Sequence, residues 1–308
     1  HVYVVRGGQV QMHALGAAER LAMESRFMRP VLPLRIEAGE TDFYFEVRSD
    51  TSIQFTSDFL TPDAYQERRE VMLALHGGFF GALFLMAFYN LFVYLSTREP
   101  SYRSYITYAL SAFLYLFSQS GMLLMFAPGV SAGFVMRFHL VMLGPYIVFM
   151  CLFGRSFLAP VLRKTWWDRA LFVIMVAGAL IMAAGLVPSI PFSSIARPAS
   201  VVVLLSLTLV FSAGIAAWLR GYRPARYYAI SLGAFAAGAM LLALRQLGVL
   251  PHNLLTSHAI QFGTLAEMAL LAFALSDRIN LLRIDSQARM EEVLRANAEL
   301  ERSGAKYR

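Results

Sequence analysis

LLTSHAIQFGTLAEMALLAFAL (Leu254–Leu275) runs directly into SDRINLLRIDSQARMEEVLRANAELERS (Ser276–Ser303). The first segment is apolar and about as long as the roughly 20 residues that a helix needs to cross a bilayer. The second segment is charged and contains neither proline nor glycine, so nothing in it ends a helix. Together they predict one long helix that leaves a membrane and continues into an aqueous compartment.

The composition of the whole chain agrees with a membrane protein. Of its 308 residues, 57% are hydrophobic and only 15% are charged, whereas about a quarter of the residues in soluble domains are charged. The net charge is +7, but the arginines lie between apolar segments, which indicates membrane topology and not nucleic-acid binding. The single cysteine, Cys151, lies in an apolar segment, so no internal disulfide, metal site or cofactor is expected.

The first 60 or so residues show the alternation and turn residues of short β-strands. Because so few strands make only a thin sheet, we expect them to be the end of a larger β-sandwich. His1 opens inside a strand pattern, so the chain is expected to begin within a longer protein and to have lost its leader. The expected strands are Val2–Val5, Gln9–Leu15, Val31–Ile36, Asp42–Ser49 and Thr51–Phe59.

Seven apolar segments follow, each near the length of a bilayer-crossing helix. The expected fold is therefore a mainly α membrane protein with residues 1–65 as a partial β-sandwich, 66–280 as a seven-helix bundle and 281–308 as a signalling helix. The expected spans are Val71–Leu95, Tyr105–Phe126, Phe134–Phe153, Ala170–Val187, Pro198–Trp218, Tyr227–Leu247 and Leu254–Leu275.

The loops between these spans differ in their basic residues, which predicts the orientation. One set of alternate loops is rich in lysine and arginine, and cytoplasmic loops carry that excess. We therefore expect the N-terminus outside the membrane and the C-terminus in the cytoplasm. The basic set is Arg98, Arg103, Arg155, Arg163, Lys164, Arg169, Arg220, Arg223 and Arg226.

The sequence contains no common catalytic or nucleotide-binding motif, so the chain itself is not expected to be an enzyme. The glycines at Gly77 and Gly81 instead form a small-xxx-small face, as do Ala234 and Gly238. Such faces predict close helix packing inside a membrane.

Polar residues inside the apolar segments cost free energy unless they are paired or hydrated, so each is a candidate for function. Five of them lie at a similar outer depth and are expected to line an outward-facing ligand cavity. The alternative is that the arginines reach lipid headgroups and the histidines bond backbone carbonyls. The five are Arg137, His139, Arg245, His258 and Gln261.

Glu267 lies near the middle of the last span, and we expect Asn90, or the hydroxyls of Ser206 and Thr208, as its partner. It is either a polar latch that rearranges when the last helix moves or a static, hydrogen-bonded carboxyl. Pro145, after Gly144 in the third span, predicts a kink, either as a hinge or as fixed architecture.

The charged helix carries a candidate seam for a dimeric coiled coil, with one extra four-residue step that locally unwinds such a coil. Asn297 in a core position would fix the register of a dimer, and the alternative is a monomeric exposed helix. Met290, Val293 and Asn297 are the expected signal-transmitting positions, with Asn90, Pro145 and Glu267 in the bundle. The full seam is Ile279, Leu282, Ser286, Met290, Val293, Asn297 and Leu300.

Residues 219–279, LRGYRPARYYAISLGAFAAGAMLLALRQLGVLPHNLLTSHAIQFGTLAEMALLAFALSDRI, resemble the membrane region of bacterial seven-transmembrane receptors with diverse intracellular signalling modules. Residues 79–110 resemble it too, with Tyr89-Asn90 and the loop Arg98–Tyr102. The similarity extends over roughly residues 71–281, in order and without large gaps.

DFYFEVRSDTSIQF (residues 42–55) looks like the end of the periplasmic jelly-roll domain of that family, a domain similar to carbohydrate-binding modules. The resemblance implies a receptor that senses a small molecule, with a saccharide as one candidate, and that drives an output module such as a diguanylate cyclase or a histidine kinase. All three tryptophans lie in the membrane region, so sugar stacking in these strands would use Tyr3 or Tyr44. The alternative function is a small-solute transporter or channel, which flux into proteoliposomes would reveal.

Overall fold

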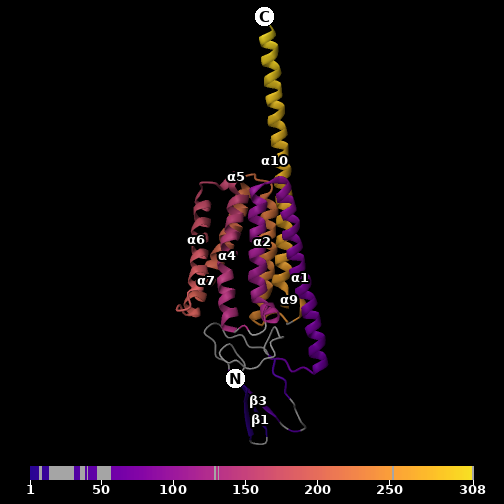
Figure 1. Cartoon of the computed structure of the whole chain (residues 1–308), viewed down its shortest axis with the longest axis vertical. Coiled ribbons are helices and arrows are strands. Elements are labelled where there is room, and N and C mark those ends of the chain that lie inside the picture. The colour runs from indigo at the N-terminus through magenta and orange to yellow at the C-terminus, as the bar shows by residue number, and fades with distance from the viewer. Residues whose placement is uncertain are drawn as a thin grey trace.

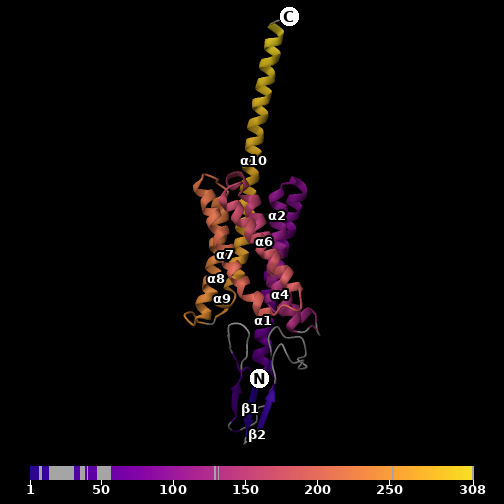
Figure 2. The same ribbon diagram turned by 90° about the vertical axis from the view of Figure 1, so that its left-hand side faces the viewer.

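The computed structural model places a helical bundle in the middle, a small sheet at one end and a single projecting helix at the other (Figures 1 and 2). This arrangement confirms the long C-terminal helix expected from the sequence. The structure describes residues 1–6, 9–13, 31–34, 39, 41–46, 57–127, 130, 132–251 and 253–306.

Within the described residues, six helices are long and apolar enough to cross a membrane. The chain is therefore a multi-pass membrane protein. The six are α1 (Pro62–Thr97), α4 (Ala132–Phe157), α6 (Trp166–Leu186), α7 (Phe192–Leu219), α8 (Ala225–Gln246) and α10 (Ala259–Lys306).

The expected second span, Tyr105–Phe126, is divided into α2 (Pro100–Gln119) and α3 (Met122–Phe126). Gly121 adopts a φ of 78° between them, a backbone conformation that glycine tolerates best. α2 lies in the bundle alongside its neighbours (Figure 1) but is not among the six apolar helices. Its serines and tyrosines face the interior, which lowers its hydropathy, so the expected count of seven apolar spans is not reached.

The ends of the helices follow from local sequence signals. The side chain of Thr61 accepts a hydrogen bond from the Ala64 amide at the start of α1, where Pro62 takes the first position, as helix N-termini favour. Asn253 forms a capping box with Thr256 at α9 (Leu254–Ser257). The expected last span therefore begins as a separate short helix, and α10 starts one residue after His258.

The N-terminal residues form a three-stranded antiparallel sheet in the order β2-β1-β3. β1 (Val2–Arg6) and β2 (Gln9–His13) confirm the first two expected strands as far as His13 and pair with each other, and β3 (Asp42–Phe45) pairs with the other edge of β1. Residues 31–34 are not a strand, and Pro33 there lacks the amide that a ladder needs. The parts of the expected strands at 14–15, 35–36, 47–49 and 51–56 lie outside the described residues, while residues 46 and 57–59 are not in a strand.

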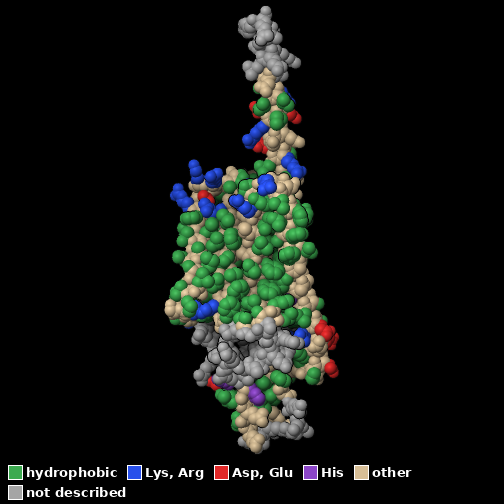
Figure 3. Space-filling view, viewed as in Figure 1, with side chains coloured by type: hydrophobic (Ala, Val, Ile, Leu, Met, Phe, Trp, Pro, Cys, Tyr) green, Lys and Arg blue, Asp and Glu red, His purple; other side chains and the backbone are tan. Residues whose placement is uncertain are grey.

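The lysine and arginine side chains are concentrated at one end of the bundle. Figure 3 shows apolar side chains around its middle and lysine and arginine side chains gathered at the end where α10 leaves. The loops that the sequence marks as basic lie near one another at this end, since Arg278 contacts Glu99 and Phe157 and Arg220 bonds the Val161 carbonyl. The sheet lies beyond the opposite end (Figures 1 and 2).

Glycines set two close helix contacts in the bundle. A Cβ on Gly238 of α8 would lie 2.5 Å from the Ala259 carbonyl oxygen of α10, so the expected packing at Ala234 and Gly238 is confirmed. A Cβ on Gly144 of α4 would lie 2.6 Å from the Gly178 oxygen of α6. By contrast, no atom lies within 4 Å of a Cβ at Gly77 or Gly81. The expected close packing there is wrong within this chain, because that face of α1 points away from the bundle.

Candidate functional site

The candidate functional site is the set of contacts that hold α10, because α10 is the one described element that reaches from the bundle into the projecting end (Figure 1). The contacts form three levels along the helix. We call them the outer level, near the sheet, the middle level and the exit level, where α10 leaves the bundle.

At the outer level, two buried histidines from different helices meet. The rings of His76 on α1 and His258, just before α10, lie 5.6 Å apart in an edge-on arrangement. The Nδ1 atom of each ring bonds a carbonyl oxygen one turn earlier, at Met72 and at Leu254. The predicted residue His258 is therefore anchored to the bundle, and His76 is its neighbour that the sequence reasoning missed.

The other residues of the expected outer cavity have different surroundings. Arg137 donates hydrogen bonds to the carbonyl oxygens of Val187, Pro188 and Ile190, at 2.8–3.0 Å, in the loop between α6 and α7. His139 bonds the Ser118 hydroxyl on α2 at 3.1 Å. Arg137 therefore holds the loop between α6 and α7.

Arg245 and Gln261 are both half-buried, in the last turn of α8 and the first turn of α10. Among the described residues, no hydrogen bond, ion pair or ring contact joins any two of Arg137, His139, Arg245, His258 and Gln261. The five do not form one cluster of contacts, and ligand binding at them stays a prediction.

At the middle level, Glu267 is 1% exposed and accepts a 2.7 Å hydrogen bond from the Tyr108 hydroxyl of α2. Its second oxygen, Oε2, has no partner in the described part of the chain. One residue along, the Met268 carbonyl accepts a 2.9 Å bond from Tyr105. Two tyrosines of α2 therefore hold the middle of α10.

The expected partners of Glu267 are wrong, because each one bonds its own helix. Asn90 donates to the Met86 carbonyl, while Ser206 and Thr208 donate to carbonyls three and four residues earlier in α7. Hydroxyls and amides in helices often satisfy themselves in this way. The tyrosine hydroxyl reaches further than these side chains and can cross between helices.

A row of aromatic rings joins the middle level to His139. Tyr108 lies 5.8 Å from Tyr146, Tyr146 lies 5.0 Å from Tyr115, and Tyr115 stacks on His139 at 4.7 Å. We call Tyr108, Tyr115 and Tyr146 the tyrosine row. It brings two of the predicted residues, His139 and Glu267, into one chain of contacts through α2 and α4.

Pro145 lies within α4, which remains one helix from Ala132 to Phe157. The neighbouring Gly144 approaches α6 so closely that any side chain there would strike the backbone of Gly178. This contact explains Gly144 as packing, and a hinge at Pro145 stays a prediction.

At the exit level, one guanidinium joins three helices. Arg278 of α10 forms a 3.0 Å ion pair with Glu99, and both side chains are only 13% exposed. Its Nη1 donates to the Ser156 and Phe157 carbonyls, at 3.0 and 2.8 Å, at the end of α4. Glu99 in turn caps α2 by accepting from the Ser101 amide. We call Arg278, Glu99 and these two carbonyls the exit clasp.

The exit clasp is the main feature of the site that the sequence analysis missed. The spacing of Arg278 after the buried residues of α10 could have indicated it. Arg278 lies three, four and seven residues after Leu275, Ala274 and Leu271, which are all buried. A residue at those spacings shares their helix face. A charged residue on the buried face, directly after the apolar segment, indicates a partner inside the bundle.

Ile279, the first position of the expected coiled-coil seam, is half-buried and packs against the bundle core. The coiled coil itself stays a prediction. From Leu282 onward the seam is exposed, including Met290, Val293 and Asn297. The side chain of Leu300 lies outside the described residues.

A prediction concerns the bond at the middle level. Glu267→Gln is expected to change the free energy of unfolding by less than about 1 kcal/mol, because an amide oxygen can still accept from Tyr108. Glu267→Leu is expected to cost about 1–3 kcal/mol, because the buried Tyr108 hydroxyl then loses its acceptor on α10. Unfolding in mixed detergent micelles measures both, with Tyr108→Phe/Glu267→Leu as the control that removes both partners. Equal losses for Gln and Leu would show that this bond does not hold α10.

Comparison with known proteins agrees with this arrangement. A family model described as 7TM diverse intracellular signalling matches residues 72–278. No curated protein and no solved structure matches the chain. The matched region begins in α1, includes α2 and ends at Arg278 of the exit clasp, so it covers the bundle and all three levels that hold α10. The chain therefore belongs to the seven-transmembrane family with diverse intracellular signalling, a family of transmembrane signalling receptors.

Proposed function

We propose that this receptor senses a small molecule outside a bacterial inner membrane and transmits its state along α10 to a cytoplasmic output module. The observation that carries the proposal is the exit clasp, where α10 leaves the bundle bonded to both α2 and α4. A shift of α2 against α4 changes the positions of the groups that Arg278 bonds. We propose that α10 then moves with them.

The distribution of charge supports the proposed orientation. The basic residues gather at the end where α10 leaves (Figure 3), and positive residues accumulate on the cytoplasmic side of membrane proteins. We therefore place the sheet in the periplasm and the end of α10 in the cytoplasm. We further propose that the enzymatic chemistry belongs to an output domain such as a diguanylate cyclase or a histidine kinase, and not to residues 1–308.

The sheet offers a surface that suits a saccharide. Tyr3 and Tyr44 are directly opposite each other on neighbouring strands, so their side chains share one face. Tyr44 is exposed, and the Tyr3 hydroxyl bonds Glu46 at 3.0 Å. An aromatic ring beside a carboxylate provides stacking and a hydrogen-bond acceptor, which are the groups that a sugar uses. We propose that this face belongs to the ligand site of a larger jelly-roll domain.

Transmission requires a ligand that binds two arrangements of the bundle with different affinities, since equal affinity shifts nothing. We propose that two copies of the receptor pair through α10 beyond Leu282, where Met290 and Val293 are exposed apolar residues. Pairing would bury them. The distance between the two Val293 positions then reports the state of the bundle.

The test uses the full-length receptor in nanodiscs, with Val293→Cys in a Cys151→Ala background. Oxidation is expected to give a disulfide-linked dimer. The same protein is titrated with a panel of monosaccharides and disaccharides, and binding is detected as a shift in melting temperature. A saccharide that binds is expected to change the rate of disulfide formation at position 293 at least severalfold.

The matched control is Glu291→Cys, because two helical steps of 100° place it on nearly the opposite side of α10 from Val293. It is expected to crosslink slowly with and without saccharide. Equal crosslinking at both positions would contradict the dimer. A saccharide that binds without changing the rate at Val293 would contradict transmission through α10, and a panel without any binder would contradict saccharide sensing.

A further inference from the structure

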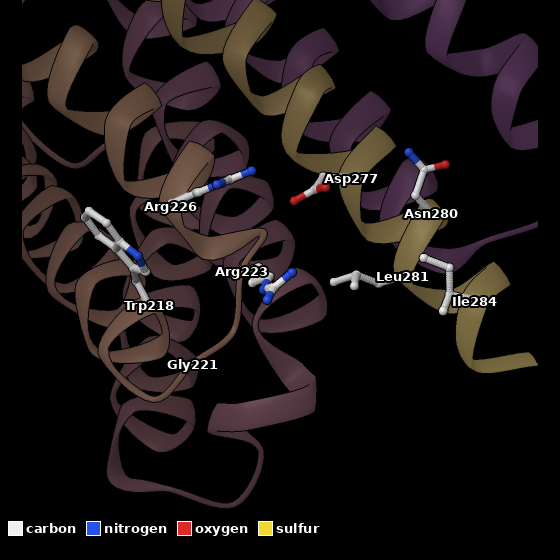
Figure 4. Close-up of a pocket in the computed structure, with 8 residues that line it drawn as sticks. All are labelled: Trp218, Gly221, Arg223, Arg226, Asp277, Asn280, Leu281 and Ile284. Carbon is white, nitrogen blue, oxygen red and sulfur yellow. The ribbon is translucent and has the colours of Figure 1, made fainter. Parts of the chain in front are cut away.

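A cavity of about 480 Å³ lies at the exit level, between α10 and the loop that joins α7 to α8. It is on a different side of α10 from the exit clasp, whose partners are α2 and α4. Figure 4 shows Arg226 and Asp277 directed toward each other across it, with Arg223 beside Leu281. The residues that the argument uses are Trp218, Arg223, Arg226, Asp277, Asn280 and Leu281.

The charged groups of this cavity form no close ion pair with one another. Neither Arg223, Arg226 nor Asp277 takes part in an ion pair among the described residues. Arg226 lies over the ring of Tyr227 and bonds its hydroxyl at 3.0 Å, which holds its guanidinium at the rim. Two arginines at one opening favour a phosphate, which accepts hydrogen bonds from both nitrogens of a guanidinium.

The cavity continues toward the apolar belt of the bundle. A second cavity of about 220 Å³ shares Asp277 and Asn280 and is also lined by Tyr227, Phe273 and Ser276. Phe273 lies one turn of α10 before Asp277, about 6 Å nearer the middle of the bundle, and it is exposed. The charged cavity therefore has an apolar extension along the seam between α8 and α10.

The site lies at the depth of a membrane interface. Trp218, at the end of α7, lines the cavity and is about half exposed. Tryptophans concentrate where the hydrocarbon meets the headgroups. Basic pockets between transmembrane helices on this side of a membrane commonly hold lipid headgroups. A molecule with a phosphate at the rim and an acyl chain along Phe273 fits both cavities.

We propose that the two cavities between α8 and α10 together bind a phospholipid from the surrounding leaflet. The headgroup of this lipid carries a hydrogen-bond donor. Arg223 and Arg226 bind its phosphate. Asp277 and Asn280 accept from the donor, such as the ammonium group of phosphatidylethanolamine, and one acyl chain lies along Tyr227 and Phe273. Phosphatidylcholine has the same phosphate and the same net charge but no such donor, so it binds less well.

The test measures fluorescence of the full chain in detergent micelles with Trp166→Phe and Trp167→Phe, which leaves Trp218 as the single tryptophan of the three. Phosphatidylethanolamine with brominated acyl chains is titrated in and quenches Trp218 when it binds. Arg223→Gln/Arg226→Gln is expected to raise the lipid fraction for half-quenching by roughly fivefold for each arginine removed. Brominated phosphatidylcholine is expected to need a higher fraction than phosphatidylethanolamine.

The matched control is Arg163→Gln/Arg169→Gln, which removes the same charge from exposed positions at the same end of the bundle. Its Trp218 is expected to be quenched at the same lipid fraction as in the parent protein. Arg223→Lys/Arg226→Lys is the second variant, and it is expected to lie between the parent protein and the glutamine pair. The proposal would be overturned if the glutamine pair and the control pair were quenched equally. It would also be overturned if the two brominated lipids quenched the parent protein equally.

Water-soluble glycerophosphoethanolamine distinguishes a lipid from a free phosphate ester. It is expected to compete only at far higher concentration than the lipid, because it lacks the acyl chain. Competition at equal concentration would assign the cavity to a soluble ligand and overturn the lipid site. The titration needs no signalling output, so its failure would leave the proposed receptor function standing.

Discussion

Arg278→Gln is expected to lower the free energy of unfolding by about 3 kcal/mol, near the lower end for breaking a buried ion pair. The variant leaves the Glu99 carboxylate almost buried without its counter-charge. It also removes one of the donors to the last carbonyls of α4, which carry the negative end of the helix dipole. The result should be a bundle whose exit level is loosened.

Exchanging the two charges tests whether the exit clasp is a simple ion pair. If it were, Glu99→Arg/Arg278→Glu would restore most of the stability that either single substitution removes. Here we expect no recovery, because each side chain has a second partner of fixed polarity. An arginine at position 99 cannot accept from the Ser101 amide, and a glutamate at position 278 would face the Ser156 and Phe157 carbonyls.

Unfolding in mixed detergent micelles measures Arg278→Gln, Glu99→Gln, the exchange and the double variant Glu99→Gln/Arg278→Gln. The control is Arg289→Gln, since Arg289 pairs with Asp285 on the exposed part of α10 and is 76% exposed. Exposed pairs of this kind contribute little. A full rescue by the exchange would show that charge pairing alone accounts for the exit clasp.

Gly238→Leu is expected to separate α8 from α10 and to destabilise the bundle by about 1–3 kcal/mol, the usual cost of overpacking. The reason is backbone contact, which cannot relax by a change of side-chain rotamer. A Cβ at this position would lie 2.5 Å from the Ala259 oxygen and 3.1 Å from the Gly263 Cα.

The matched control for this variant is Gly77→Leu, because no atom lies within 4 Å of a Cβ there. It is expected to fold with at least the stability of the parent protein, since leucine also has the higher helix propensity. Both variants are compared by thermal unfolding in detergent. Equal losses would mean that Gly77 is packed in the folded protein, for example against a second copy.

The sequence predicts those parts of the fold that depend on local patterns. The long C-terminal helix follows from a continuous run without breakers, and the first two strands follow from the alternation of side chains at Val2–Val5 and from Gln9 onward. The close approach at Gly238 follows from the spacing of small residues. The same spacing at Gly77 and Gly81 gave a wrong expectation, because spacing does not say which side of a helix meets a neighbour.

Contacts between distant helices explain what the sequence did not predict. Glu267 was identified as a buried polar group, but its partner Tyr108 lies 159 residues away and in a helix that looks only weakly apolar. Arg278 lies in the charged sequence that follows the last apolar span, and the sequence analysis assigned it no partner, although it belongs to the buried face. In both cases the side chain was visible in the sequence, and its partner was set by the packing of α2.

The length of α10 beyond the exit clasp gives it the mechanics of a lever. From Arg278 to Lys306 the helix is continuous, which at 1.5 Å per residue is an arm of about 42 Å. With Arg278 as the fulcrum, a tilt of about 5° displaces the far end by roughly 4 Å, a distance comparable to a one-residue step of a β-strand. Rearrangements inside the bundle that are smaller than a side chain can therefore reach the far end of α10 as displacements of several ångströms.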